Sequence, residues 1–536
     1  MKATQKKKYI PILILIVAAI VIGGATSVYY FINNQALAAT FSTSTSALPD
    51  AKDTEVVSLR DGQTYELIAT PVKRSIGGKE VRLLGYNGMV PGPTLQVAQG
   101  AKVTLKLTNQ IDIATTLHPH GVNGDNKSDG LPGVTQKQIE VGQTFTQVLQ
   151  FPDTGVYWYH PHVREDYTQA SGLYGNFIVK PKSGADWPIV SREQPLVLSD
   201  IALDANGILP FNKTKADHTL MGRFGTVQLV NGKDTYQETV KNGDVVRYYI
   251  TNTASTRVFR FAIAGAKLKL IGADNGFYEQ EKFVDSVTLG PAERAIIDVY
   301  YPKEGSYTMQ NATPSQSYTL GTVTATSGTP THPQVADIFA VEQTHPDVTT
   351  SIAPYLARLD TATKKRLAIT LNMDMSLMHE STSSSMNGNM MNMGGMDMSS
   401  TSLGSDGIEW SDGMESMNAK STVDTVQWRL QDLDTKSTDI NWVFKKGELV
   451  KLTIDNNASA MHPMQHPVHI HGQRFVVTAI NGVPQTNLVW KDTILIPAGK
   501  TYTLAVVMDN PGKWMIHCHI PEHLESGMMG NFTVEE

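Results

Sequence analysis

One strand-like segment recurs three times at wide intervals along the chain. The copies read Gly100-Ala-Lys-Val-Thr-Leu, Gly243-Asp-Val-Val-Arg-Tyr and Gly447-Glu-Leu-Val-Lys-Leu. Short runs of Val, Ile, Leu, Thr and Tyr surround each copy and are broken by Gly and Pro, which is typical of all-β sandwich chains. A chain of 536 residues is also too long for one core and suits three domains of about 150 residues each. We therefore predict an all-β protein of three Greek-key β-sandwich domains.

The repeat also suggests where the domains begin and end. We place the first domain at residues 56–185, the second at 186–345 and the third at 346–536. The third domain contains a methionine-rich insertion, residues 373–417. A linker rich in Ser, Thr and Ala precedes the first domain and ends at about residue 55.

The first 40 residues have the pattern of an export signal or a membrane anchor. Lys6 to Lys8 precede an uncharged apolar run from Tyr9 to Ile32, and Ala36-Leu37-Ala38 offers a small-residue cleavage site. An apolar run of about 20 residues is long enough to span a bilayer, so cleavage and anchoring both remain open. Either way we expect an extracytoplasmic protein, periplasmic or at the cell surface, and either secreted or anchored to the membrane.

The charge balance argues against a nucleic-acid partner. Lys and Arg total 45 and Asp and Glu total 51, which gives a net charge of −6. An acidic surface would instead attract cations such as metal ions. We expect a monomer.

The most specific chemical signal is near the C-terminus, where the only cysteine, Cys518, stands between His517 and His519. A strand alternates its side chains between faces, so the two imidazoles would point one way and the thiol the other. Cysteine, His523, Met528 and one further imidazole make the ligand set of an electron-transfer copper, with a weak axial thioether.

Three other histidine clusters share the H-x-H spacing. In extended chain, a two-residue step of about 6.6–7 Å puts both rings on one face, where neighbouring metal ions can be held. A single H-x-H pair could equally be a surface or core pair, but four pairs and one enclosed cysteine make coincidence a poor explanation. The clusters are H-P-H-G from His118, W-Y-H-P-H from Trp158 and H-P-V-H-I-H-G from His466.

With these motifs the chain resembles the multicopper oxidases, which include laccases, ascorbate oxidases, ferroxidases and bacterial copper-efflux oxidases. V-P-G-P-T-L from Val90, T-L-H-P-H-G from Thr116 and the Asp129-Gly130 pair extend the resemblance over most of the chain. It implies cupredoxin-like domains and four copper ions, one type 1, one type 2 and two type 3. By motif, type 1 would take His466, Cys518, His523 and Met528, type 2 would take His118 and His469, and the type 3 pair would take His120, His160, His162, His471, His517 and His519.

The sequence departs from the family at two positions, one near the type 2 ligands and one where many members carry an acid that is expected to deliver protons. Leu524 follows the type 1 histidine where many bacterial members carry an acid, and Pro119 stands where many have Trp. Asp129 matches a family acid near the trinuclear cluster, so we take it as the main catalytic candidate. Glu522 and Glu525 flank Leu524 and are weaker candidates.

The remaining histidines lack paired spacing. We expect His218, His332, His345 and His379 to be surface or structural residues, and His462 to be an alternative type 1 ligand at most. Because the middle repeat lacks ligand clusters, we expect the trinuclear cluster between the first and third domains, with the middle domain mainly a spacer.

Nine of the 21 methionines fall between Met373 and Met398, in a stretch dominated by Ser, Gly, Asn and Asp. This segment lacks the apolar partners of a core helix and is expected to be a loop. Thioethers are soft donors that prefer Cu(I), although a low-complexity insertion without a binding role would look the same. The candidate Cu(I) donors are Met373, Met375, Met378, Met386, Met390, Met391, Met393, Met396 and Met398.

Together with the resemblance, these observations predict an oxidase that couples one-electron oxidation of Cu(I), or of another donor such as a phenol, to the four-electron reduction of dioxygen to water. With Cu(I) as the donor, its function would be copper detoxification. A laccase that oxidises phenols, with an incidental methionine loop, is the first alternative. A protein that only sequesters Cu(I) and a copper nitrite reductase are further alternatives, which the intact ligand set and the three repeats disfavour.

Overall fold

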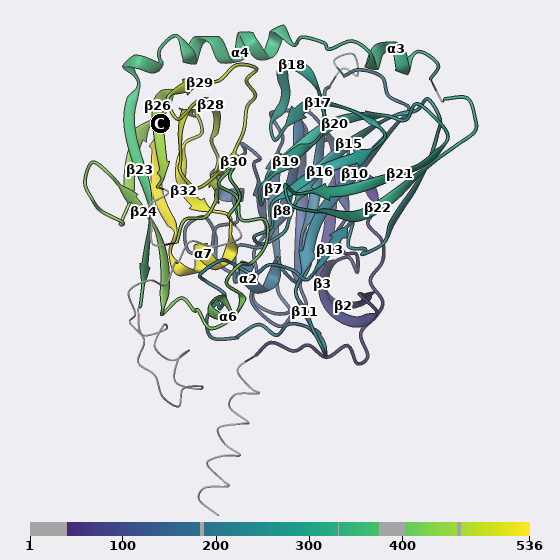
Figure 1. The fold of residues 1–536 in the computed structure, drawn as a ribbon. Helices are drawn as coiled ribbons and strands as arrows, with labels where there is room; N and C mark the ends of the chain where they lie inside the picture. The colour runs from purple at the N-terminus through teal and green to yellow at the C-terminus, as the bar shows by residue number, and fades with distance from the viewer. Residues whose placement is uncertain (1–39, 183–186, 331, 375–402, 458–461) are drawn as a thin grey trace, which may run out of the picture.

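The structure is a computed structural model that describes residues 40–182, 187–330, 332–374, 403–457 and 462–536. Within these residues the chain forms seven sheets. Six of them pair into three β-sandwiches of cupredoxin type, and the seventh is the small β11–β12 hairpin. Figure 1 shows the third sandwich in green and yellow beside the first and second sandwiches.

The first sandwich packs a four-stranded sheet, in the order β3-β2-β5-β7, against a five-stranded sheet, in the order β1-β4-β9-β8-β6. Its apolar core includes Leu67, Val103 and Phe177. Its elements are β1 (Val56–Ser58), β2 (Thr64–Ile76), β3 (Lys79–Tyr86), β4 (Thr94–Ala98), β5 (Lys102–Asn109), β6 (His118–His120), η1 (Asn126–Ser128), β7 (Thr144–Gln150), β8 (Gly155–His160), α2 (Glu165–Thr168) and β9 (Gly175–Lys180).

The second sandwich has a six-stranded sheet, in the order β13-β10-β15-β20-β17-β18, and a five-stranded sheet, in the order β14-β22-β21-β16-β19. Its elements are β10 (Arg192–Ile201), β11 (Leu203–Asp204), β12 (Gly207–Ile208), β13 (Val227–Val230), β14 (Tyr236–Lys241), β15 (Val245–Asn252), β16 (Phe259–Ala264), β17 (Lys267–Ala273), β18 (Gly276–Val284), β19 (Val287–Leu289), β20 (Arg294–Tyr300), β21 (Gly305–Ala312) and β22 (Ser317–Thr326).

The third sandwich repeats this plan with sheets in the orders β24-β23-β26-β31-β28-β29 and β25-β33-β32-β27-β30. Its elements are β23 (Thr363–Met373), α6 (Glu415–Asn418), β24 (Val426–Asp432), β25 (Asn441–Lys445), β26 (Glu448–Asn456), β27 (His466–Ile470), β28 (Arg474–Ile480), β29 (Val483–Pro484), β30 (Thr493–Ile496), β31 (Lys500–Met508), β32 (Gly512–Cys518), α7 (Pro521–Ser526) and β33 (Met529–Glu535).

The three copies of the repeated segment occupy the same place in the three sandwiches. They become β5, β15 and β26, and each pairs in parallel with a strand from earlier in its sandwich (β2, β10 and β23) and antiparallel with one from later in it (β7, β20 and β31). The glycine at the start of each copy has a positive φ, +80° at Gly100, +85° at Gly243 and +83° at Gly447. An L side chain is strained in that conformation, which explains why the repeat begins with glycine.

Apolar side chains from all three sandwiches meet at a shared cluster. It includes Val156 of β8, Tyr249 of β15 and Trp490 of the third sandwich, and α4 covers it with Val348 and Ile352. The connection from the second to the third sandwich contains α3 (Val335–Phe339), α4 (Pro346–Leu356) and η2 (Leu359–Thr361). Figure 1 shows α3 and α4 along the top of the molecule, where they bridge the two sandwiches.

The structure corrects the expected extent of the methionine-rich loop. Met373 is the last residue of β23, is 7% exposed and belongs to the core of the third sandwich, because strand pairing with Val426 carries it inward. Met414, which precedes α6, and Met417, which lies within it, also pack against that core. The other eight candidate donors, from Met375 to Met398, lie outside the described residues, as do His379 and the N-terminal apolar run. Among the helices described, none is long and apolar enough to cross a membrane.

Candidate metal centres

Two pairs of neighbouring strands carry the predicted ligands. In the first sandwich β6 pairs with β8, which sets His118 opposite His160. In the third sandwich β27 pairs with β32, which sets His469 opposite His517. The short helices α2 and α7 follow these strands and pack against each other. The two sandwiches therefore bring equivalent strand pairs to one interface.

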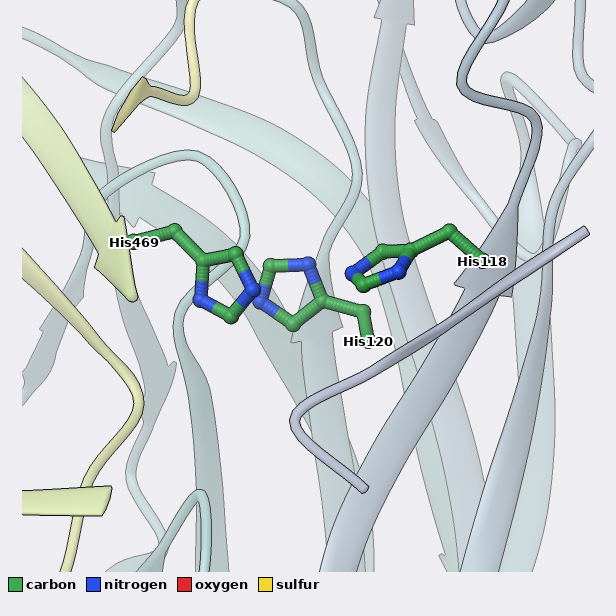
Figure 2. Close-up of side chains that lie close together, drawn as sticks. All are labelled: His118, His120 and His469. Carbon is green, nitrogen blue, oxygen red and sulfur yellow. The ribbon is translucent and has the colours of Figure 1, made fainter. Parts of the chain in front are cut away.

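His118, His120 and His469 form the first group of side chains close enough to share a metal ion. Figure 2 shows His118 and His120 of β6 and His469 of β27 converging across the interface. The rings of His120 and His469 stack with their centroids 3.7 Å apart, and those of His118 and His469 are 5.7 Å apart. Imidazole nitrogens suit copper.

Two further triads lie next to this group. His120, His160 and His519 make one, and His162, His471 and His517 make the other. Each triad combines ligands from the first and third sandwiches. All eight imidazoles are at most 7% exposed.

The hydrogen bonds of these histidines run outward and leave nitrogens facing the centre. His118 Nδ1 donates to the Asp129 carbonyl at 2.6 Å, His469 Nδ1 to the Asp492 carbonyl at 2.9 Å, and His160 and His517 donate to Pro161 and Cys518 carbonyls. These bonds fix the tautomer, so that the other nitrogen presents a lone pair. Within the described residues, His118 Nε2, His120 Nδ1, His160 Nε2, His162 Nε2, His469 Nε2 and both nitrogens of His519 have no hydrogen-bond partner.

His471 Nε2 and His517 Nε2 lie 3.0 Å apart and also face inward. Buried polar atoms are normally hydrogen-bonded, so this number of unpartnered nitrogens at one place needs an explanation. Burial lowers the pKa of both His471 and His517 far below the usual range. At His471, the Asp129 carboxylate opposes this effect and the neighbouring His118 adds to it. Neutral imidazoles with inward lone pairs fit bound copper ions.

A second centre lies on the other face of β32. Cys518 Sγ is 3.7 Å from His466 Nδ1 and 3.8 Å from His523 Nδ1, and the two nitrogens are 3.3 Å apart. All three residues are fully buried. Burial raises the pKa of Cys518, so a bound metal is needed to hold it as a thiolate.

Met528 completes this group better than Met529 does. The Cys518 amide donates to the Met528 carbonyl at 3.0 Å, and the Met528 amide donates to the His523 carbonyl at 3.0 Å. Met528 is fully buried in the core that contains Cys518, whereas Met529 is 38% exposed. The structure therefore favours Met528 as the thioether beside Cys518.

Asp129 lies between the predicted type 2 and type 3 ligands. Its carboxylate accepts a hydrogen bond from His471 Nδ1 at 3.0 Å, and its carbonyl accepts the one from His118. Burial opposes ionisation of Asp129, but His471 and His118 hold its pKa below the usual range. The charged carboxylate thus orients one imidazole from each sandwich.

The two weaker carboxylate candidates occupy different surroundings on α7. Glu522 is fully buried, and neither of its carboxyl oxygens has a hydrogen-bond partner among the described residues. Burial, with a contribution from Asp166, raises the pKa of Glu522 to about 8. Glu525 reaches the surface, while Leu524 packs against Leu131 and Met515.

Sequence reasoning missed two acids that contact the histidines. Glu165 of α2 has a carboxylate oxygen 2.8 Å from His162 Nδ1, and Asp492 has one 3.2 Å from His120 Nε2. Glu165 follows His162 by three residues, a spacing that could have indicated the contact. Asp492 gave no such signal because it is far from His120 in the chain and reaches it only through domain packing.

The histidines outside the ligand clusters have other roles in the structure. His218 pairs with Asp217, His332 is exposed, and His345 stacks on Phe277. His462 is fully buried with its Nε2 against the Met221 sulfur, and it is not in the group formed by Cys518, His466 and His523.

Comparison with known proteins agrees with the geometry. Family models described as multicopper oxidase match residues 69–184, 199–331 and 411–536. Laccase-1 of Botryotinia fuckeliana is 26% identical over 497 residues, covering 88% of this chain and 82% of the relative. A copper resistance protein A homolog of Pseudomonas syringae pv. tomato is 23% identical over 568 residues, covering 89% of this chain and 94% of the relative.

A solved multicopper oxidase from Campylobacter jejuni superposes with a TM-score of 0.64 and 23% identity, covering 92% of this chain and 99% of that one. At this identity the likeness shows the shared fold. The three family matches together span more than half of the chain, one on each sandwich. Together with the buried histidine groups, they show that this chain belongs to the multicopper oxidase family, whose members are copper-dependent oxidoreductases.

Proposed function

We propose that the protein binds four copper ions and couples the one-electron oxidation of Cu(I) to the four-electron reduction of dioxygen to water. Bound copper supplies the redox chemistry, which no side chain of the chain provides. Type 1 copper would be held by His466, Cys518, His523 and Met528, type 2 by His118 and His469, and the type 3 pair by His120, His160, His162, His471, His517 and His519.

The position of Cys518 between His517 and His519 carries this proposal. Side-chain alternation in β32 directs the thiol toward His466 and His523, and the neighbouring imidazoles toward the other histidine groups. One residue of backbone therefore joins an electron-transfer ligand to the ligands of an oxygen site. An oxidase needs such a connection, whereas a protein that only sequesters Cu(I) does not.

The protein's own contribution is to hold each buried ligand side chain in one orientation and one protonation state. Three carboxylates lie against the outer nitrogens of ligand histidines. The pairs are Asp129 with His471, Asp492 with His120, and Glu165 with His162. Ligand histidines with such partners bind metal more tightly, since the partner fixes the ring and raises its basicity. The burial of all the proposed ligand imidazoles also keeps water from competing for the inward nitrogens.

Cu(I) is the donor that the methionine content supports best. Eight methionines lie in residues 375–402, and the chain re-enters the described structure at Leu403 before Met414 and Met417 pack on the core that contains Cys518. The copper resistance relative is consistent with this substrate, while the laccase relative is consistent with a phenol. An N-terminal export signal or anchor would place the enzyme outside the cytoplasm.

Replacement of the eight methionines by serine distinguishes Cu(I) from a phenol as the donor and keeps the length of the segment unchanged. The variant changes Met375, Met378, Met386, Met390, Met391, Met393, Met396 and Met398. Serine lacks the soft sulfur that Cu(I) prefers, so kcat/KM for Cu(I) should fall at least tenfold while phenol oxidation holds or rises. A control variant with eight serines of the same segment changed to alanine should match the parent. An unchanged Cu(I) rate in the methionine variant would favour a laccase.

A further inference from the structure

A buried arginine of the middle sandwich lies where the three sandwiches meet. Arg294 is the first residue of β20 and is 1% exposed. Its Nε donates to the Val156 carbonyl of β8, in the first sandwich, at 3.0 Å. Its Nη1 donates to Asp492 Oδ1, in the third sandwich, at 2.7 Å, and its Nη2 donates to Asp492 Oδ2. One guanidinium thus connects all three sandwiches.

Asp492 links Arg294 to two of the histidines shown in Figure 2, His120 and His469. Its Oδ1 lies 3.2 Å from His120 Nε2, and its carbonyl accepts from His469 Nδ1 at 2.9 Å. The Thr493 hydroxyl donates to Asp492 Oδ1 at 2.8 Å and accepts from His120 Nε2 at 2.9 Å. The residue held by Arg294 therefore supports an imidazole from the first sandwich and one from the third.

We propose that Arg294 is a positioning residue for the type 2 side of the trinuclear site, so that the middle sandwich helps to build a site to which it contributes no ligand. The proposal rests on the proposed function, because it requires type 2 copper at His118 and His469 and type 3 copper at the neighbouring His120. It replaces the expectation that the middle domain is mainly a spacer.

The physical reason is the buried charge of Asp492. A carboxylate without solvent is stable only when it is paired and hydrogen-bonded, and the planar guanidinium fixes both of its oxygens at once. Behind Arg294, the Asp274 carboxylate lies 3.4 Å from Nη1, and Lys491 Nζ lies 3.1 Å from the other Asp274 oxygen. Opposite charges thus alternate from Lys491 through Asp274 and Arg294 to Asp492, which leaves the Asp492 position little freedom.

The glycine that follows His120 supports this account. Gly121 has a φ of +82°, and a Cβ there would lie 2.2 Å from Asp492 Oδ2 and 2.7 Å from Arg294 Nη2. The ion pair is therefore packed against the backbone of the ligand strand. A displacement of the guanidinium would act directly on the residue next to His120.

The test compares Arg294 with a second buried arginine of the same sheet. Arg247 of β15 is also 1% exposed and makes a bidentate pair with Asp298, with both hydrogen bonds at 2.8 Å, but neither residue contacts the histidine groups. Each arginine is replaced in the full chain by Met and by Lys. The readouts are bound copper per chain, the type 1 absorption band, the type 2 electron paramagnetic resonance signal and the thermal midpoint.

We expect Arg294→Met to bind type 2 copper about 10- to 100-fold more weakly, the usual effect when the outer partner of a ligand histidine is lost, because Asp492 would no longer be held in place. Its type 1 band should remain, because Cys518 and His523 do not contact this ion pair. Arg294→Lys should recover part of the type 2 signal by restoring the charge. Both Arg247 variants should keep the type 2 signal even where their thermal midpoint falls.

A folded Arg294→Met or Arg294→Lys protein with the full type 2 signal would overturn the inference, as would equal copper loss in the Arg247 variants. If Arg294→Met does not fold, the comparison of Arg294→Lys with Arg247→Lys decides. A parent chain that binds copper normally but does not reduce dioxygen would contradict the proposed activity, while the loss of type 2 copper in the Arg294 variants would still support this inference.

Discussion

At the scale of single residues, Cys518 contacts both candidate metal centres. Its thiol faces His466 and His523, and its carbonyl accepts a hydrogen bond from His517 Nδ1 at 2.9 Å. The same residue thus belongs to one centre by its side chain and to the other by its backbone. A change confined to the side chain should disable one centre and leave the other.

Cys518→Ser should abolish turnover and the intense blue absorption expected of a type 1 copper bound by cysteine, but should leave the fold intact. Serine has nearly the same volume as cysteine, but its hydroxyl does not supply the soft thiolate that this copper site requires. Absorption spectroscopy, oxygen uptake and circular dichroism test the three parts of the prediction, and the copper content should fall by about one ion per chain. Retention of normal oxidase activity would disprove the proposed electron path.

His462 supplies a pH test that does not depend on turnover. Burial lowers its pKa to about 4, against about 6.5 in the unfolded chain. Between these values the unfolded state binds more protons, so the contribution of His462 to stability is present above about pH 6.5 and is lost as the pH falls toward 4. His462→Gln should therefore lose less stability than the parent over this range.

The measurement is the thermal midpoint of copper-loaded protein from pH 7 to pH 4.5. His332→Gln is the matched control, since His332 is exposed, and its profile should follow that of the parent. An unchanged pH profile for His462→Gln would mean that His462 is solvated and protonates freely in the folded protein.

The sequence indicated the ligands far better than it indicated their supports. H-x-H spacing and the H-C-H motif are local, so His118, His469 and Cys518 could be picked out as candidate ligands without a structure. Arg294 and Asp492 are 198 residues apart and meet only because three sandwiches pack together. No local pattern in the chain carries that information.

At the scale of elements, the turn after β6 is a tight constraint near the site. Its glycine, Gly121, approaches the Arg294–Asp492 pair more closely than a side chain would allow. The repeated strands β5, β15 and β26 were predictable from their shared pattern, and their parallel and antiparallel neighbours confirm that they are equivalent. The helix α4 was not predicted, because its partners in the interdomain cluster come from distant strands.

Gly121→Ala should destabilise the protein by about 3 kcal/mol, through a left-handed φ and overpacking against a buried ion pair. Gly62→Ala is a matched control, because Gly62 has a φ of +76° but no atom within 4 Å of the added Cβ. That variant should lose only about 1 kcal/mol. Thermal unfolding and type 2 copper content distinguish the two, and equal losses would show that the turn can move away from Asp492.

At the scale of the whole molecule, the group of eight buried histidines belongs to no single domain. The first and third sandwiches supply the imidazoles, and the second supplies the guanidinium that holds Asp492. The all-β class and the three sandwiches followed from the chain length and the repeat, and the structure confirms them. The docking of the sandwiches did not follow, because it depends on complementary surfaces such as the cluster under α4.

Oxygen uptake by the copper-loaded chain, with Cu(I) and separately with a bulky phenol as sole donor, tests the central claim most directly. The proposed function predicts faster uptake with Cu(I), four Cu(I) oxidised for each dioxygen and no hydrogen peroxide released. Faster uptake with the phenol would contradict the choice of donor, and no uptake with either would contradict the oxidase.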